Sequence, residues 1–145
     1  MLIGIASCIS PELLSVLSRM GHGDEIVLAD AFFPGDSFNE RVIRADGIRI
    51  PLLLDGILAL MNLDSYVDAP VIMMQPTSGD KLDASVEAAY RAAIDQHWPN
   101  TPAIARMERF AFYERAKKAF AVVMTGETAT YGNVILKKGV ISVKR

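Results

Sequence analysis

The residues best suited to chemistry lie in one short stretch near the start of the chain. His22 is one of only two histidines in 145 residues, and it stands between Gly21 and Gly23, directly before Asp24 and Glu25. Imidazole titrates near neutral pH, so a histidine can both give and take a proton during catalysis. The structural alternative is that His22 merely belongs to a helix C-terminus, where glycines are common. The acidic neighbours of His22 favour general acid/base chemistry over helix capping.

Two further groups of polar residues lie where predicted strands end or begin. Asp30 closes a β-rich run over residues 25–30. In open α/β sheets, ligands bind beyond the carboxyl ends of strands, so Asp30 is either a solvated strand end or a contact for a hydroxyl-rich ligand. Thr130-Tyr131-Gly132-Asn133 is a good turn sequence, but its phenol and amide are also groups that grip sugar hydroxyls. Arg109 is either a surface charge or an anchoring donor, and its spacing favours neither.

The chain offers little to a metal ion or a nucleotide. A catalytic zinc site needs three protein ligands, and the second histidine, His97, lies beside Trp98 at a predicted helix end, far along the chain from His22. The segment 21–26 begins like a dinucleotide-binding loop. However, Ile26 stands where the third glycine is required, and the segment follows a helix and precedes a strand. We therefore expect no metal and no cofactor.

Composition places these residues in one globular domain, residues 1–145. Hydrophobic residues make up 51% and charged residues 22%, which excludes disordered and fibrous classes. The net charge of −2 argues against nucleic acid as a partner, and no apolar run reaches the roughly 18 residues that cross a membrane.

The mean hydropathy of +0.25 is high, so we expect a homo-oligomer that buries apolar surface. The single cysteine, Cys8, excludes an internal disulfide, and the N-terminus does not resemble a signal peptide, so we expect a cytoplasmic protein.

The elements that must position these residues alternate between helices and strands. Capping residues and apolar spacing predict helices over residues 11–20, 51–61, 83–98 and 112–118. Short apolar runs predict strands over residues 25–30, 42–44, 70–74 and 119–125. Residues 106–110 fit neither pattern, and residues 133–143 are predicted to form an antiparallel hairpin that turns at Lys138-Gly139. This alternation is typical of an α/β domain with a mostly parallel central sheet, to which the hairpin would add an edge.

Taken together, these motifs resemble the sugar mutarotase family that contains ribose pyranase and L-fucose mutarotase. Asp30 with Phe33-Pro34 contributes to the resemblance, and the other motifs span nearly the whole chain in order: SPELL at 10–14, MGHGDE at 20–25, VIRADG at 42–47, LDSY at 63–66, RFAFYER at 109–115, YGN at 131–133 and LKKGV at 136–140. In its details the chain is closer to the fucose branch than to the ribose branch. Segments 34–39 and 74–82 match less distinctly, and such loops could alter the choice of sugar.

The resemblance implies a cofactor-independent isomerase that interconverts the α and β anomers of a free aldose, with L-fucose as the expected sugar. It also implies a three-layer α/β fold and a ring-based homo-oligomer, a decamer, with sites near subunit contacts. The family's acid/base histidine falls on His22. Its sugar-binding residues fall on Asp30, Arg109, Tyr131, Gly132 and Asn133.

Several alternatives stay open at this point. Tyr131 is the expected second proton relay, but a bound water could take that role. The same pocket could serve a non-catalytic sugar-binding or regulatory subunit, or a ring-form isomerase of the ribose pyranase type.

Overall fold

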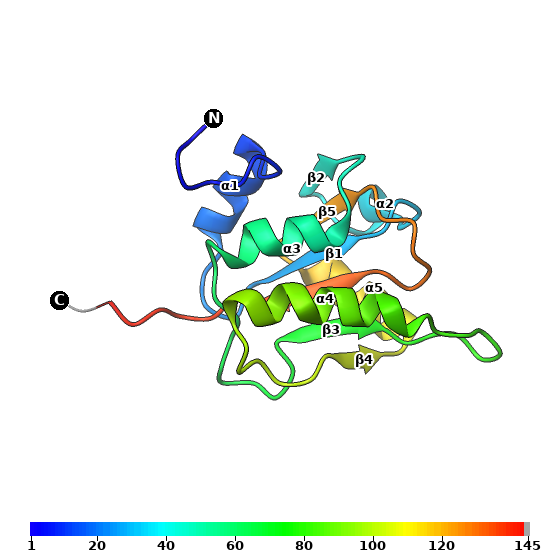
Figure 1. Ribbon diagram of the computed structural model, residues 1–145. Helices are drawn as coiled ribbons and strands as arrows, with labels where there is room; N and C mark the ends of the chain where they lie inside the picture. Colours follow the sequence, from blue (N-terminus) through cyan, green and yellow to red (C-terminus); the bar gives the residue numbers. More distant parts are fainter. Residues whose placement is uncertain (144–145) are drawn as a thin grey trace.

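Six strands form one sheet in the computed structural model, which describes residues 1–143 (Figure 1). The strand order is β2-β5-β1-β6-β3-β4. The strands are β1 (Glu25–Ala29), β2 (Val42–Ala45), β3 (Val71–Met74), β4 (Ala105–Met107), β5 (Ala121–Thr125) and β6 (Val134–Lys137). Five strands run in one direction, and β6 runs antiparallel to both of its neighbours, β1 and β3. The mostly parallel sheet predicted from the sequence is therefore confirmed.

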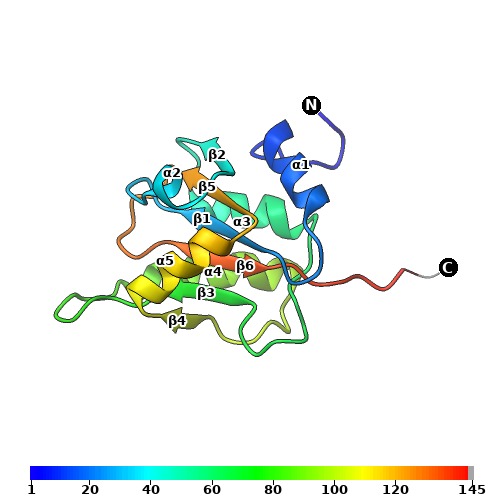
Figure 2. The same ribbon diagram turned by 180° about the vertical axis from the view of Figure 1, so that it is seen from behind.

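Helices cover both faces of this sheet. On one face lie α1 (Pro11–Arg19), α3 (Ile50–Leu58) and α4 (Ala84–His97), as Figure 1 shows. On the other face lie the short α2 (Gly35–Phe38) and α5 (Arg109–Lys118), which are in front in Figure 2. The side chains of β1 alternate between the two cores, with Ile26 and Leu28 in the first and Val27 and Ala29 in the second. This arrangement confirms the three-layer α/β fold.

Capping residues set where the helices begin. Ser10 Oγ accepts a hydrogen bond from Leu13 N at 3.1 Å, so α1 starts at Pro11 as predicted. Asp83 caps α4 in the same way, through the backbone N–H of Ser85. The ambiguous segment 106–110 divides between two elements, because β4 ends at Met107 and Glu108 caps α5. Helix α5 therefore begins three residues before the predicted start at residue 112.

The predicted C-terminal hairpin is wrong, although the antiparallel direction is right. Strand β6 has no hairpin partner after it within the described residues; it lies in the middle of the sheet between β1 and β3. Its side chains Val134, Ile135 and Leu136 are fully buried, which is what a central strand requires. Lys138-Gly139 is not a turn, because Lys138 extends along the start of β1, where its N–H donates to Asp24 O at 2.9 Å.

A buried carboxylate fastens the connection between β5 and β6 to the start of α3. Glu127 is only 2% exposed, and its two oxygens accept hydrogen bonds from the Arg49 guanidinium at 2.7 and 3.1 Å. Burial alone would raise the pKa of Glu127. The bonds from Arg49 and from backbone N–H groups, including that of Ala129, outweigh burial and hold this pKa below its usual value. The charged form of Glu127 therefore stabilises the fold.

Replacing Glu127 by glutamine should lower the free energy of unfolding at neutral pH by about 1.5–3 kcal/mol, the usual contribution of a hydrogen bond to a charged group. In the wild type this contribution is complete above the unfolded-state pKa of about 4.3 and disappears as the pH falls through the lower folded-state pKa. The difference between variant and wild type should therefore shrink in acid. Denaturant unfolding at several pH values measures both effects. Glu114→Gln changes an exposed glutamate, so a similar loss in that control would contradict the assignment.

Candidate active site

The direction of β6 brings two of the predicted groups to one edge of the sheet. Asp30 follows the carboxyl end of β1, and the turn Tyr131-Gly132-Asn133 precedes the antiparallel β6, so both lie at the same edge. Asp30 N donates to Asn133 Oδ1 at 2.7 Å, and both residues are buried. A hydrogen bond between residues 103 positions apart thus joins the two halves of the candidate site.

A cavity of about 410 Å³ opens at this edge. Its volume lies within the range of small-molecule sites. One part of its lining is polar and contains Asp30, Thr77, Asp80, Arg109, Thr128, Thr130, Tyr131 and Asn133. The other part is aromatic and aliphatic and contains Phe32, Phe33, Pro34, Met74 and Tyr113. A lining that combines polar side chains with aromatic and aliphatic ones suits a small polar ligand that also has an apolar side.

The Asp30 carboxyl lies in the wall of this cavity. Its Oδ1 already accepts the N–H of Phe32 at 3.0 Å, which fixes the side chain against the loop after β1. Burial raises the pKa of Asp30, and hydrogen bonds from Phe32 and Asn133 oppose that rise in part. Sequence reasoning placed Asp30 at a strand end that meets a ligand, and the structure places it in the cavity wall.

Tyr131 has an unusual backbone, and its hydroxyl is hydrogen-bonded to residues of a neighbouring loop. Its φ of 58° lies in the left-handed region, which residues with bulky side chains rarely adopt. Its hydroxyl lies 2.8 Å from Thr77 Oγ1, accepts the N–H of Thr77 at 3.2 Å and donates to Asp80 Oδ2. Both partners belong to the loop between β3 and α4. Strained conformations of this kind persist where the surroundings hold them, often at functional sites.

Gly132 has a structural reason to be glycine. A Cβ at this position would lie 2.9 Å from Ala129 O and 3.0 Å from the Tyr90 hydroxyl. Tyr90 in α4 donates a hydrogen bond to Gly132 O at 2.8 Å, which holds the turn against the helix layer. Gly132 therefore acts through close backbone approach, which lets the flanking Tyr131 and Asn133 both line the cavity.

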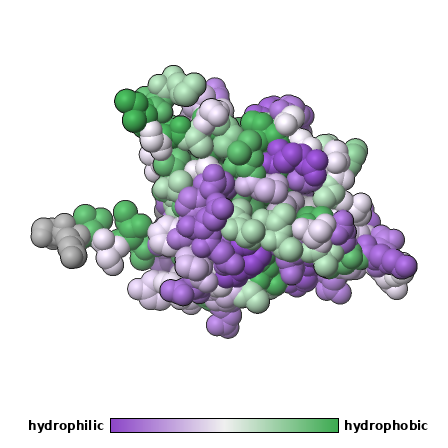
Figure 3. Space-filling view, viewed as in Figure 1, coloured by the Kyte–Doolittle hydropathy of each residue, from purple (hydrophilic) through white to green (hydrophobic). Residues whose placement is uncertain are grey.

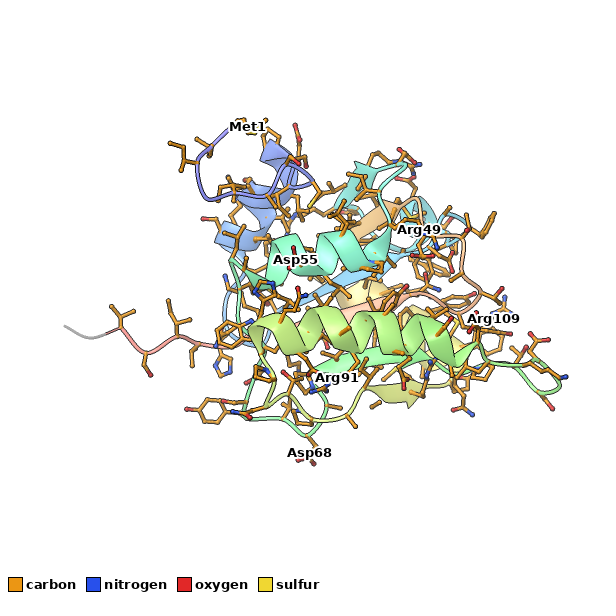
Figure 4. The ribbon with its side chains drawn as sticks, in the orientation of Figure 1. Met1, Arg49, Asp55, Asp68, Arg91 and Arg109 are labelled. Carbon is orange, nitrogen blue, oxygen red and sulfur yellow. The ribbon has the colours of Figure 1, made fainter. Side chains whose placement is uncertain are left out.

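Arg109 lies at the mouth of the cavity, as the first residue of α5. Its Nε donates to the Tyr113 hydroxyl at 2.9 Å, and its guanidinium carbon lies 5.3 Å from the centre of the Tyr113 ring. Figure 4 shows Arg109 at the end of the molecule from which the loop between β3 and α4 projects. The sequence left Arg109 as either a surface charge or an anchoring donor. Its position in the cavity lining favours the donor.

His22 does not join this group. It lies three residues before β1 begins, whereas Asp30 follows the end of β1, and a strand of five residues spans roughly 15 Å. The loop that carries His22 is bonded instead to the far end of β6, through Gly23 N and Lys138 O at 2.8 Å. Within one chain, His22 and the cavity are at opposite edges of the sheet.

The surroundings of His22 nevertheless suit proton transfer. His22 Nε2 lies 3.1 Å from Oδ1 of the buried Asp64, and the ring centre of Tyr66 is 5.5 Å from the imidazole. The N–H of Tyr66 and the bond to His22 hold the pKa of Asp64 below its usual value. An ionised carboxylate only accepts, so Nε2 carries a proton toward Asp64 and Nδ1 is not used in this pair.

The helix-capping alternative for His22 receives no support from the structure. Helix α1 is capped at its C-terminus by Met20, whose N–H bonds to Val16 O. The carbonyls of Leu17 and Met20 accept hydrogen bonds from Lys138 Nζ at 2.8 and 2.6 Å. The end of α1 is therefore satisfied without the imidazole.

Sequence reasoning missed Asp64, Thr77 and Asp80. Asp64 lies 42 residues from His22 and had no assigned role, although it stands in the LDSY motif. Spacing along the chain could not reveal that contact.

Among the described residues 1–143, no three histidine, cysteine or acidic side chains gather where a metal ion could bind. No helix in that same part of the chain is long and apolar enough to cross a membrane.

Comparison with known sequences points to one family. The profile of the RbsD / FucU transport protein family matches residues 3–141. The L-fucose mutarotase of Actinobacillus pleuropneumoniae serotype 5b (strain L20) is 60% identical over 144 residues, which cover 99% of this chain and 100% of that protein. The L-fucose mutarotase of Haemophilus influenzae (strain 86-028NP) is 55% identical over 143 residues, which cover 99% of each chain.

Solved structures agree with this assignment. A fucose mutarotase from Streptococcus pneumoniae, solved in complex with L-fucose, matches with a TM-score of 0.92 and 51% identity over 97% of this chain and 100% of that one. Bacillus subtilis RbsD complexed with D-ribose has a TM-score of 0.72 and 23% identity over 98% and 100% of the two chains, and shares the fold. With a profile match over residues 3–141 and relatives 55–60% identical over 99% of its length, the chain belongs to the RbsD / FucU family.

Proposed function

We propose that this chain is an L-fucose mutarotase, an isomerase that interconverts the anomers of the free sugar without a cofactor. The observation that carries the proposal is the cavity at the sheet edge. Its carboxylate, guanidinium and phenol (Asp30, Arg109 and Tyr131) match the hydroxyls of a pyranose. Its apolar wall, which includes Phe33 and Met74, suits the methyl group of a 6-deoxy sugar such as L-fucose. The names of the close relatives support the same substrate.

The chemistry requires only proton transfer. Ring opening removes the proton from the anomeric hydroxyl O1 and adds a proton to the ring oxygen O5, and closure on the other face reverses both steps. No electron, phosphoryl or acyl group moves. An imidazole oriented by Asp64 supplies one acid/base group, and Tyr131 supplies the second. In this assignment Asp30, Arg109 and Asn133 hold the sugar hydroxyls.

Because His22 and the cavity lie at opposite edges of one chain, we assign them to a site shared between neighbouring copies. His22 of one subunit would face the cavity of the next, in a homo-oligomer for which a ring-based decamer is the expected form. Exposed apolar side chains support an assembly: Met1, Leu2, Ile3, Leu52, Val140, Ile141 and Val143. Figure 3 shows apolar surface on the N-terminal segment and on the chain that leaves β6. We expect this assembly in the cytoplasm.

A mixing experiment tests the shared site. His22→Gln and Asp30→Asn should each be nearly inactive, but oligomers assembled from both chains should regain the activity expected from random assortment. Some contacts in the mixed oligomer then combine an intact His22 with an intact cavity. NMR exchange between L-fucose anomers measures the rate, and light scattering confirms that the two chains assemble. Failure of mixed assemblies to gain activity would contradict the shared site.

His22→Gln should keep the fold and slow anomer exchange by about 10²–10⁴-fold, the usual effect of losing a general acid/base. Asp64→Asn should slow exchange less, since the imidazole stays but is no longer oriented by a carboxylate. His97→Gln is the matched control. His97 Nε2 bonds to Asp55 at 2.7 Å in a similar pair, away from the cavity lining. Equal rates for His22→Gln and wild type would remove His22 from the mechanism.

Binding of L-fucose should weaken as the pH falls, because the ionised Asp30 accepts hydrogen bonds from sugar hydroxyls. Burial raises the pKa of Asp30, so the loss should be centred above the ordinary value of about 3.9. Calorimetric titration at a series of pH values measures it. Asp30→Asn should bind weakly at every pH. Wild-type affinity that stayed constant down to pH 4 would show that Asp30 does not hold the sugar as a carboxylate.

Two controls separate the remaining alternatives. A non-catalytic sugar-binding subunit would bind L-fucose without speeding the exchange of its anomers. A ring-form isomerase of the ribose pyranase type would act faster on D-ribose than on L-fucose. The same NMR measurement over a panel of aldoses therefore tests the enzyme class and the sugar together.

A further inference from the structure

We propose that Asp80 is part of the proton relay, as the group that receives the phenolic proton of Tyr131 when that phenol accepts a proton from the sugar. The inference deepens the proposed mutarotase function and rests on it. It gives the loop between β3 and α4 a role beyond that of a cavity wall. Asp80 acts through Tyr131, so it is a positioning residue rather than one that contacts the reacting atoms.

The geometry around the Tyr131 hydroxyl carries the inference. The hydroxyl donates its proton to Asp80 Oδ2 and accepts the backbone N–H of Thr77 at 3.2 Å. The Thr77 hydroxyl lies 2.8 Å from the same phenol oxygen and donates to Asp80 Oδ2 at 3.1 Å. Each of these groups lines the cavity.

This arrangement fixes which way the proton of Tyr131 points. A phenol has one donor and two acceptor lone pairs. Here the donor is committed to Asp80 and one lone pair to the Thr77 N–H. The Thr77 hydroxyl has one proton, which can go to Asp80 Oδ2 or to the phenol oxygen. When it goes to Asp80, the second lone pair of Tyr131 is open to a ligand hydroxyl. Tyr131 therefore meets the sugar as a proton acceptor, and an acceptor needs somewhere to send its own proton.

The proposed step balances in protons and charge. As the ring opens, the C1–O5 bond breaks and C1=O1 forms. The O1 proton moves to the Tyr131 oxygen, and the phenolic proton of Tyr131 moves to Asp80. Protonated His22 of the neighbouring subunit gives a proton to O5. On closure, O5 returns its proton to His22, and Asp80 returns its proton through Tyr131 to O1.

The surroundings of Asp80 favour a group that starts the cycle ionised. The hydrogen bonds from Tyr131 and Thr77 lower the pKa of Asp80, in that order of importance. Asp80 is exposed, so the carboxylate is solvated before the sugar arrives. Asp83 offers a contrast only three residues later. It bonds to Ser85 as the cap of α4 and does not line the cavity.

Steady-state kinetics provide the first test, which distinguishes a role of Asp80 in proton transfer from a role only in lining the cavity. Asp80→Asn should lower kcat by roughly 10- to 100-fold with KM little changed, because a relay matters most as the ring bond breaks. In the Tyr131→Phe background, Asp80→Asn should have no further effect, since the relay is already broken. Asp83→Asn is the matched control, because asparagine also caps helices well, and it should exchange anomers at the wild-type rate. A raised KM with unchanged kcat for Asp80→Asn would make the loop only a wall and overturn the inference.

Chemical rescue provides the second readout. Asp80→Ala leaves room for a small carboxylate, and the exposed position gives solvent access. Added formate should restore part of the lost kcat in Asp80→Ala but not in the Asp80→Ala, Tyr131→Phe double variant. A purely structural role for Asp80 would leave the rate insensitive to formate, and that result would overturn the proposal.

Failure of this inference can be told apart from failure of the proposed function. If the wild-type protein does not speed anomer exchange, the mutarotase function fails, and the relay fails with it. If the wild type is active and Tyr131→Phe is slow, but Asp80→Asn and Asp80→Ala both exchange at the wild-type rate, only the role of Asp80 is wrong.

Discussion

The antiparallel pairing of β6 with β1 and β3 is the constraint on which the rest of this structure depends. Strand β6 lies in the middle of the open sheet and joins two sets of parallel strands. Both of its faces are covered by helices, so its side chains must be apolar on both sides. It also reverses the chain, which brings the turn before β6 to the carboxyl edge beside Asp30. If β6 were parallel to β1, Tyr131 and Asn133 would lie at the other edge of the sheet. The cavity exists because one strand runs against the others.

The same strand lies between the cavity residues and the His22–Asp64 pair. The polar side chains of the cavity lie where β6 begins, and the imidazole of His22 with the Asp64 carboxylate lies where β6 ends. A hydrogen bond holds each group in place. Asn133 accepts the backbone N–H of Asp30, and Asp64 bonds to the ring of His22. A rigid sheet cannot bend to bring its two edges together. Two copies placed edge to edge satisfy this geometry, and for that reason assembly and catalysis are linked in the proposed function.

Sequence patterns predicted local structure well because local structure depends on local causes. Ser10 and Asp83 cap their helices through residues two or three positions away, and the apolar runs of β1 and β5 are buried as expected. The hairpin failed because Lys138-Gly139 has turn chemistry, while the partners of the strand before it are fixed by long-range pairing. Asp64 was missed for the same reason, since only the folded chain brings it to His22. Motifs that resembled a known family supplied the cavity residues, which spacing alone left undecided.

The left-handed backbone of Tyr131 has a consequence for how this protein can evolve. A non-glycine residue in that region costs of order 1–3 kcal/mol, and glycine or asparagine would relieve most of the cost. The fold would gain stability from a substitution that removes the phenol from the cavity. Selection for stability and selection for the cavity thus oppose one another at this single position.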